Sequence, residues 1–365
     1  MIYFDNAATT CVFPEVVEAM QDAMQVTYGN PSAKHMKGIE AENKVKAAQE
    51  LIAKTLRAKP KEILFTSGGT ESNNTAIIGT AMANRRKGKH IITTKVEHAS
   101  VYEPMYHLEE EGYEVTYLDV DSEGIVDLDQ LEESIREDTI LVSCMMVNNE
   151  IGAIEPIEEI AKIIKAKNPN TIFHVDAIQA YGKLPIVPKN MGIDLLSTSG
   201  HKIHGPKGIG FLYIRKGVKI GSFIHGGAQE RKRRAGTENV PGIVGLGKAV
   251  EIAVATMEER TKKESELRDY LIERVLKEVP YSRLNGPRKD RLPNNVSFCF
   301  QFIEGESLLI MLDMKGICAS SGSACTSGSL DPSHVLLAIG LPHEIAHGSL
   351  RLTLGADTTK EDMDT

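Results

Sequence analysis

Seven short runs of apolar and β-branched residues recur between about residues 60 and 215. They cover residues 62–65, 90–94, 113–118, 139–147, 171–176, 194–199 and 208–214. Stretches with helical spacing separate most of these runs, and several runs are apolar at both odd and even positions. Such runs are typical of strands that are covered on both faces. The pattern therefore predicts an α/β fold in which a mostly parallel seven-stranded sheet is flanked by helices.

The C-terminal part of the chain has a different pattern. A long helix-compatible region spans residues 242–279, followed by a strand pattern at 294–300, a helical one at 306–316 and a second strand pattern at 348–355. With 365 residues, the chain is too long for one ordinary core. We expect a large domain over 15–255 and a smaller α+β domain formed by 1–14 and 256–365. Residues 358–365 resemble a helix cap and a helix start, so we expect the natural chain to continue further.

Charge and hydropathy narrow the class of protein. The chain has 42 basic and 50 acidic side chains and a net charge of -8, which argues against a general binder of nucleic acid or membranes. Its first ten residues lack the basic and apolar regions of a signal peptide. No stretch reaches the roughly 20 apolar residues of a membrane span. The basic run 231–234 is either a solvated surface cluster or a contact for phosphate, RNA or a partner.

The five cysteines, at positions 11, 144, 299, 318 and 325, form no CxxC pair and no metal-ligand spacing. Free thiols in a reducing cytosol are the simplest account, so we expect a cytoplasmic protein without a resident metal. Cys144 and Cys299 lie in apolar runs, as buried inert cysteines do. Cys325 lies instead in the polar string SSGSACTSGS. An exposed thiol on a mobile loop, at about 321–332, suits a nucleophile that travels to its target.

Lys202 lies in the string STSGHKIHGPKG, directly after the predicted strand 194–199. A lone lysine is usually a solvated surface residue. An amine buried at a strand end, however, can have a lowered pKa and act as a nucleophile toward a carbonyl. The neighbouring hydroxyl and glycine backbone suit a phosphate. Lys202 is therefore a candidate for carrying a carbonyl cofactor.

Other chemically useful side chains follow other predicted strands. Residues 65–74, FTSGGTESNN, form a strand, a Gly-rich turn and a helix start, which either presents N–H groups to an anion or is plain loop geometry. Asp176 suits a protonated ring nitrogen or a helix cap, and Gln179 follows it. His98 and Asn149 come after two further strands. Because the carboxyl ends of parallel strands form the ligand-binding edge of such sheets, we expect these groups to converge.

With these residues in place, the sequence closely resembles the cysteine desulfurase family. This is the IscS/NifS-like branch of the fold-type I pyridoxal phosphate enzymes, within the class V aminotransferase group. The resemblance runs nearly end to end, through YFDNAATT, YGNPSAKH, TSGGTESNN, VEHAS, NNEIG, HVDAIQ, SGHKIHGPKG, HGGAQE, RAGTENV, SSGSACTSGS and RLTLG. One departure is His204, where the family often has tyrosine. The resemblance implies the fold-type I architecture, with a large and a small domain, and pyridoxal phosphate as cofactor.

The resemblance also implies roles around the cofactor. Lys202 would carry it as a Schiff base and move the Cα proton of the substrate. His98 would stack on the ring and assist proton transfer, Asp176 would keep the ring nitrogen protonated, and Gln179 would contact the ring oxygen. The remaining cofactor-binding positions are Gly69, Thr70, Asn149, Ser199, His201 and Thr237. Thr237 would reach the phosphate in the neighbouring subunit, which implies a homodimer.

The implied substrate is L-cysteine, with Asn149 and Arg351 near its carboxylate. Arg351 interrupts the predicted strand 348–355, and an inward-facing arginine usually holds a carboxylate. Cys325 would attack the substrate sulfur, giving L-alanine and a persulfide for a sulfur-acceptor protein such as an iron–sulfur scaffold, and Cys325 could also contact a transferred cluster. The rivals are a selenocysteine lyase, an aminotransferase and, in another class, a non-catalytic scaffold of the same fold. No direct contact with nucleic acid or membrane is expected.

Overall fold

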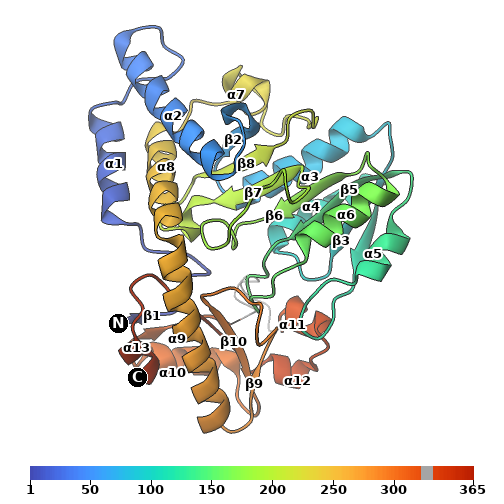
Figure 1. Ribbon diagram of the computed structural model, residues 1–365, viewed down its shortest axis with the longest axis vertical. Coiled ribbons are helices and arrows are strands. Elements are labelled where there is room, and N and C mark those ends of the chain that lie inside the picture. Colours follow the sequence, from blue (N-terminus) through green and yellow to red (C-terminus); the bar gives the residue numbers. More distant parts are fainter. Residues whose placement is uncertain (322–331) are drawn as a thin grey trace.

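The computed structural model describes residues 1–321 and 332–365. Its largest sheet has seven strands in the order β2-β8-β7-β6-β5-β3-β4 (Figure 1). Their bounds are β2 (Ile63–Thr66), β3 (His90–Thr94), β4 (Glu114–Leu118), β5 (Thr139–Met145), β6 (Ile172–Asp176), β7 (Leu195–Ser199) and β8 (Gly210–Ile214). Within this sheet β8 runs opposite to the other six strands, and the neighbouring strands from β7 to β4 are parallel. The seven predicted strands are confirmed, with their ends displaced by at most two residues.

Alternation along the strands builds a hydrophobic core on each face of this sheet. Ile63, Phe65 and Phe173 belong to one core, whereas their chain neighbours Leu64 and Ile172 belong to the other. The first core is covered by α1 (Pro14–Gln25), α2 (Met36–Thr55), α5 (Leu128–Ser134), α6 (Ile157–Lys167) and α8 (Val240–Ala255), and the second by α3 (Gly69–Asn84) and α4 (Ala99–Glu110). Both faces are therefore buried, as the apolar runs predict.

A second, antiparallel sheet has the order β12-β10-β9 and lies below the first in Figure 1. Its strands are β9 (Ser282–Leu284), β10 (Asn295–Phe300) and β12 (Ser349–Thr353), and it packs with α9 (Met257–Glu278) and α10 (Gly305–Asp313). The expected strand, helix and strand of this part are confirmed. The remaining elements are β1 (Ile2–Tyr3) paired with β11 (Ile317–Cys318), η1 (Pro60–Glu62), η2 (Gly200–Lys202), α7 (Gln229–Lys232), α11 (His334–Ala338), α12 (His343–Ala346) and α13 (Lys360–Asp364). The domain boundary at 255/256 stays a prediction.

The helix-compatible region 242–279 proves to be two helices, α8 and α9, bent by 68° at Thr256. Arg260 stabilises the break, because its Nη2 donates to the carbonyl oxygens of Ala253 and Gly182 at 3.0 and 2.9 Å. This side chain thus satisfies a carbonyl that the end of α8 leaves open. Within the described residues, no single helix is long and apolar enough to cross a membrane, although the bent pair α8 and α9 meets that criterion by length and composition.

Candidate active site

A cavity of about 310 Å³ lies where the predicted site residues converge. Its lining includes Gly69, Thr70, His98, Asn149, Asp176, Gln179, Ser199, His201, Lys202 and Arg351. Most of these residues end or follow strands of the large sheet, whereas Arg351 comes from β12 of the second sheet. Exposed Thr237 is not among the lining residues of its own chain. Cys325 lies outside the described residues.

Lys202 ends the short helix η2, directly after β7. Its Nζ donates to the carbonyl oxygens of Ala7 and Ala8, at 2.5 and 2.8 Å. These two carbonyls belong to the N-terminal segment, which therefore forms a wall of the cavity. The sequence motif FDNAATT contains this segment, but without the fold it gives no sign that its carbonyls face a lysine 194 and 195 residues away.

Asp176 ends β6 and is only 4% exposed. Its Oδ2 accepts from Asn73 Nδ2 at 2.8 Å, and its Oδ1 accepts from the backbone N–H of Ile178 at 2.9 Å. Burial raises the pKa of Asp176 above its usual value, and these hydrogen bonds together with His98 and Lys202 act against that rise. Such a carboxylate fits a cationic partner inside the cavity. Asn73 is a residue that sequence reasoning missed.

His98 is the N-cap of α4, which begins at Ala99. Its Nδ1 accepts from the backbone N–H of Ser100 at 3.1 Å, so the neutral ring carries its proton on Nε2. Burial lowers the pKa of His98 below the usual value, Lys202 lowers it further, and Asp176 opposes both. A neutral imidazole therefore lines the cavity, and its Nε2–H can donate a hydrogen bond or give up its proton there.

The start of α3 forms an anion cradle beside Ser199. Gly68 has φ 144°, a conformation that favours glycine, and it turns the chain into the helix. A Cβ on Gly69 would lie 2.2 Å from Ile178 Cδ1 and 3.6 Å from Ser199 Cβ, so a side chain at position 69 would narrow the cradle. Backbone N–H groups at the beginning of this 16-residue helix, together with the hydroxyls of Thr70 and Ser199, suit a phosphate.

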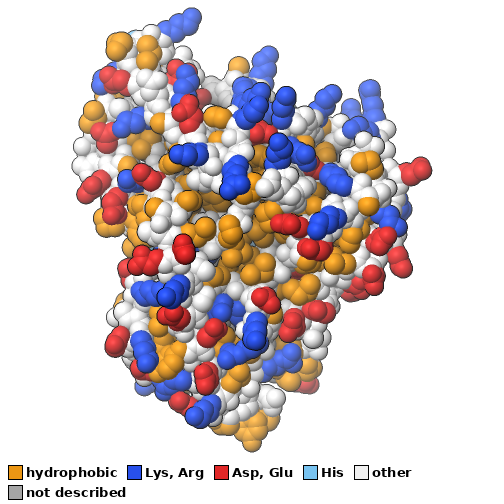
Figure 2. Space-filling model, in the orientation of Figure 1, with side chains coloured by type: hydrophobic (Ala, Val, Ile, Leu, Met, Phe, Trp, Pro, Cys, Tyr) orange, Lys and Arg blue, Asp and Glu red, His pale blue; other side chains and the backbone are white. Residues whose placement is uncertain are grey.

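Part of the basic run 231–234 is structural rather than simply solvated. Arg234 Nε and Nη2 donate to the two carboxylate oxygens of Glu71, at 3.0 and 3.3 Å. Burial would raise the pKa of Glu71, but hydrogen bonds from Arg234 and Ser67 outweigh burial, and the pKa is lowered. Arg231 and Lys232 are exposed as the surface interpretation predicts, and basic side chains gather in this upper region of Figure 2.

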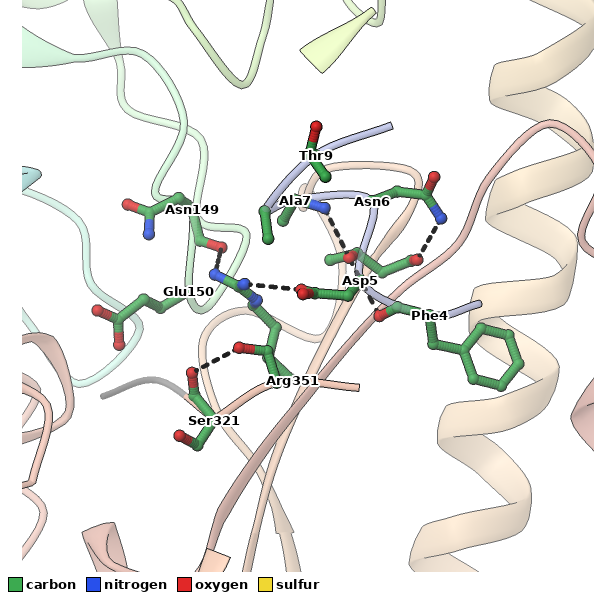
Figure 3. A network of polar contacts seen from close by, with 12 residues as sticks. Phe4, Asp5, Asn6, Ala7, Thr9, Asn149, Glu150, Ser321 and Arg351 are labelled. Carbon is green, nitrogen blue, oxygen red and sulfur yellow. Dashed lines mark hydrogen bonds and ion pairs between the residues drawn. The ribbon is translucent and has the colours of Figure 1, made fainter. Parts of the chain in front are cut away.

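Arg351 is 3% exposed and is held by groups from two distant segments. Its Nη1 donates to the carbonyl oxygen of Asn149 at 3.2 Å and its Nη2 to Asp5 Oδ1 at 3.1 Å (Figure 3). Beside Asn149, the carboxylate of buried Glu150 accepts from Ser333 Oγ. Burial raises the pKa of Glu150 to about 7, and Ser333 and Arg351 act against the rise. Sequence reasoning missed Asp5 and Glu150.

Comparison with known proteins agrees with this architecture. The aminotransferase class-V family model matches residues 2–365. The cysteine desulfurase IscS of Dictyoglomus turgidum is 55% identical over 362 residues, which cover 99% of this chain and 91% of the relative. The chain belongs to the cysteine desulfurases of the class-V aminotransferase family. The IscS of Methanosarcina thermophila is 58% identical over 363 residues, covering 100% of this chain and 89% of that protein.

Solved structures support the same assignment. A NifS-like protein superposes with a TM-score of 0.94 at 43% identity and covers 100% of this chain and 96% of its own. A structure described as SspA in complex with cysteine has a TM-score of 0.85 at 38% identity, covering 97% of this chain and 99% of its own. The predicted family and fold-type I architecture are thus confirmed.

Members of this family depend on pyridoxal phosphate, and the cavity of this cysteine desulfurase fits that group. The cradle at Gly69 suits the phosphate, and the buried carboxylate of Asp176 suits a protonated ring nitrogen. The amine of Lys202 suits the aldehyde, and it faces the same cavity. A phosphate site, a carboxylate and an amine in one cavity match the three polar ends of the cofactor.

Proposed function

We propose that this protein removes sulfur from L-cysteine, releasing L-alanine and leaving a persulfide on Cys325. The observation that carries the proposal is the single cavity that joins Lys202, His98, Asp176 and Arg351. The solved relative described as SspA in complex with cysteine supports the choice of substrate. Arg351 would bind the carboxylate of L-cysteine, with Asn149 beside it.

The cofactor would be held by the residues that fit it. Gly69, Thr70, Ser199 and His201 would hold the phosphate, Asp176 the ring nitrogen and Gln179 the ring oxygen. Bound pyridoxal phosphate supplies an electron sink for the electron pair of the substrate Cα–H bond. Burial lowers the pKa of His201 to about 4, with Lys202 and Lys207 acting in the same direction, and a phosphate anion beside the ring would act against that lowering.

This chain's own residues would perform the proton transfers. Lys202 Nζ would hold the cofactor between turnovers and take the proton from the substrate Cα. The neutral ring of His98 would give its Nε2 proton to the reacting atoms and then take it back. The low exposure of Asp176 and Arg351, 4% and 3%, would keep water away from both polar ends of the site.

Sulfur transfer would use Cys325. Its thiolate would form an S–S bond with the substrate sulfur while the substrate C–S bond breaks and leaves its electron pair on carbon. That carbon would then take a proton to give L-alanine, so the sulfur is oxidised to a persulfide and the carbon is reduced. The Cys325 role rests on the string SSGSACTSGS. A reducing cytosol, our proposed location, would keep this thiol free.

Partners follow from the same proposal. A sulfur-acceptor protein, such as an iron–sulfur scaffold or a tRNA-thiolation protein, would take the persulfide sulfur. We also propose a homodimer in which Thr237 completes the phosphate site of the other subunit. The exposure of Thr237, away from its own cavity, supports this sharing.

The decisive test compares two cysteine variants of the holoenzyme. Cys325→Ser should keep the visible absorbance of the bound cofactor and lose L-alanine formation from L-cysteine by at least ~100-fold, because the nucleophile is gone. Cys11→Ser, at an exposed free cysteine outside the cavity, is the matched control and should keep wild-type activity. L-alanine would be quantified together with sulfide under reducing conditions.

Other outcomes of these assays would contradict the proposal or indicate a different activity. Full L-alanine production by Cys325→Ser would contradict the persulfide step. A wild-type protein that converts L-cysteine to a keto acid without L-alanine would be an aminotransferase, and one that acts only on L-selenocysteine would be a selenocysteine lyase. A protein that cannot be loaded with the cofactor at all would favour the non-catalytic scaffold.

A further inference from the structure

The N-terminal segment 4–7, which ends at one of the two residues whose carbonyls accept from Lys202, is fixed to β12 by several hydrogen bonds. Thr353 N donates to Phe4 O at 2.7 Å, Asn6 Nδ2 donates to Thr353 O at 2.9 Å, and Ala7 N donates to Thr353 Oγ1 at 2.8 Å (Figure 3). Asp5 lies within this fixed stretch. Its carboxylate therefore has a defined position beside β12, the strand that carries Arg351.

From that position Asp5 holds one end of the Arg351 guanidinium. The Asp5 side chain is 22% exposed and the Arg351 side chain 4%, so solvent is nearly excluded from the guanidinium of this ion pair. Asn149 O holds Nη1, while Nε is buried without a hydrogen-bond partner among the described residues. The guanidinium is thus fixed at both Nη atoms and retains a donor that can serve a ligand.

Glu150 is the competing acid near Arg351. It is 4% exposed, and burial raises its pKa to about 7 even though Ser333 and Arg351 act against the rise. Recognition of a carboxylate by arginine requires a fixed, planar donor pair. Without Asp5, the guanidinium would lose one of its two anchors and could turn toward Glu150 instead.

We propose that Asp5 is the positioning residue that orients Arg351 to receive the carboxylate of the amino-acid substrate. The inference rests on the proposed function, in which Arg351 binds that carboxylate. Two residues beyond Asp5, the carbonyl of Ala7 accepts from Lys202. The same fixed segment therefore sets the spacing between the group that handles the substrate amine and the group that binds its carboxylate, which favours α-amino acids over simple amines.

The test titrates the holoenzyme with L-alanine and, separately, with ethylamine, which lacks a carboxylate, and follows the cofactor absorbance. Asp5→Asn should raise the Kd for L-alanine and the KM for L-cysteine about tenfold, while kcat changes by less than about twofold and the ethylamine Kd stays the same. Asp5→Glu, which retains a carboxylate, should recover part of the affinity. Asp364→Asn is the matched control, since it breaks an exposed ion pair with Arg274 Nη1 at 2.6 Å.

A double-mutant cycle separates positioning from general damage. Asp5→Asn should add nothing to the L-alanine Kd in an Arg351→Lys background, because Asp5 acts through the arginine. An unchanged L-alanine Kd in Asp5→Asn, an equal loss for ethylamine, or full additivity with Arg351→Lys would overturn the proposal. If wild type forms no L-alanine from L-cysteine, the proposed function fails, whereas the two titrations still report on Asp5.

Discussion

His174 illustrates how single buried residues set the pH range of the fold. It lies in β6 with no exposed surface, between Ser143 Oγ at 2.8 Å from Nδ1 and Ser197 Oγ at 2.9 Å from Nε2. Burial lowers its pKa from 6.5 to about 3. The folded protein therefore keeps this ring neutral at pH values where the unfolded chain protonates it.

The pH dependence of stability should reveal this histidine. From pH 6.5, where the unfolded chain binds about half a proton more at position 174, the excess grows towards one proton as the pH falls, so stability falls with a slope that approaches ~1.4 kcal/mol per unit. The free energy of unfolding of wild type should thus drop by about 2 kcal/mol more than that of His174→Gln between pH 6.5 and 4.5. Urea unfolding at both pH values measures the difference.

A control at the surface makes this test specific. His343→Gln, at an exposed position, should keep the wild-type pH profile. Equal profiles for wild type and His174→Gln would contradict a neutral buried ring.

At the residue scale, the sequence predicts which side chains lie at the ends of strands. It predicts their hydrogen-bond and ion-pair partners less well. His98, Asn149 and Asp176 are recognisable because each comes at or just after an apolar run, which is a local pattern. Asp5 is not recognisable, because its partner Arg351 is 346 residues away and their pairing depends on how β12 lies against the N-terminal segment. Chemistry that depends on long-range pairing requires the fold.

At the scale of elements, α11 begins at a cap with two functions. Ser333 Oγ accepts from the backbone N–H groups of Val335 and Leu336, at 3.1 and 3.4 Å, and it donates to Glu150. Ser333 closely follows the segment that carries Cys325 in the sequence. The hydroxyl therefore stabilises a helix start and a buried carboxyl group at once.

Ser333→Ala should cost more stability than an ordinary cap. Loss of a cap costs ~1 kcal/mol, and leaving a buried acceptor unsatisfied costs roughly 1–3 kcal/mol more. The pKa of Glu150, raised by burial, is about 7, so the penalty should grow as the pH rises from 6 to 8 and the unsupported carboxylate ionises. Chemical unfolding at both pH values provides the measurement.

Thr359→Ala is the matched control for this cap. Thr359 Oγ1 accepts from Asp362 N at 3.2 Å at the exposed start of α13, and the acid to which it donates, Asp362, is only half-buried. It should cost ~1 kcal/mol or less at either pH. Similar, pH-independent costs for the two variants would show that Glu150 does not depend on Ser333.

Regular elements were predictable and their interruptions were not. The strands of the large sheet have strong apolar patterns, whereas β1 and β11 have two residues each and form only because they pair with one another across the chain. The bend between α8 and α9 was also missed. Helical spacing continues through Thr256, and the bend depends on Arg260 reaching Gly182 in another loop.

At the scale of the whole molecule, the proposed homodimer would bring exposed apolar side chains into contact with a second copy. On and beside α1 and α2, Val17, Met24, Tyr28 and Met36 are 51%, 55%, 66% and 70% exposed. In the proposed homodimer these side chains are candidates for burial against the second copy. We expect a particle of twice 40.0 kDa in sedimentation, independent of cofactor loading.

Mixed dimers should show whether the two sites are shared. A dimer of one Lys202→Ala and one Thr237→Ala subunit, isolated through two different tags, has one doubly altered site and one intact site if Thr237 serves the neighbour. Such a dimer should have about half of the wild-type activity at limiting cofactor, as should a dimer of wild type with Lys202→Ala.

If Thr237 serves its own subunit, one site lacks the lysine and the other the threonine. The activity would then not exceed half that of the Thr237→Ala homodimer. The mixed dimer contains the same two substitutions whichever subunit Thr237 serves, so a folding defect cannot produce the half-maximal activity. Activity at or below half that of the Thr237→Ala homodimer would rule out the shared site.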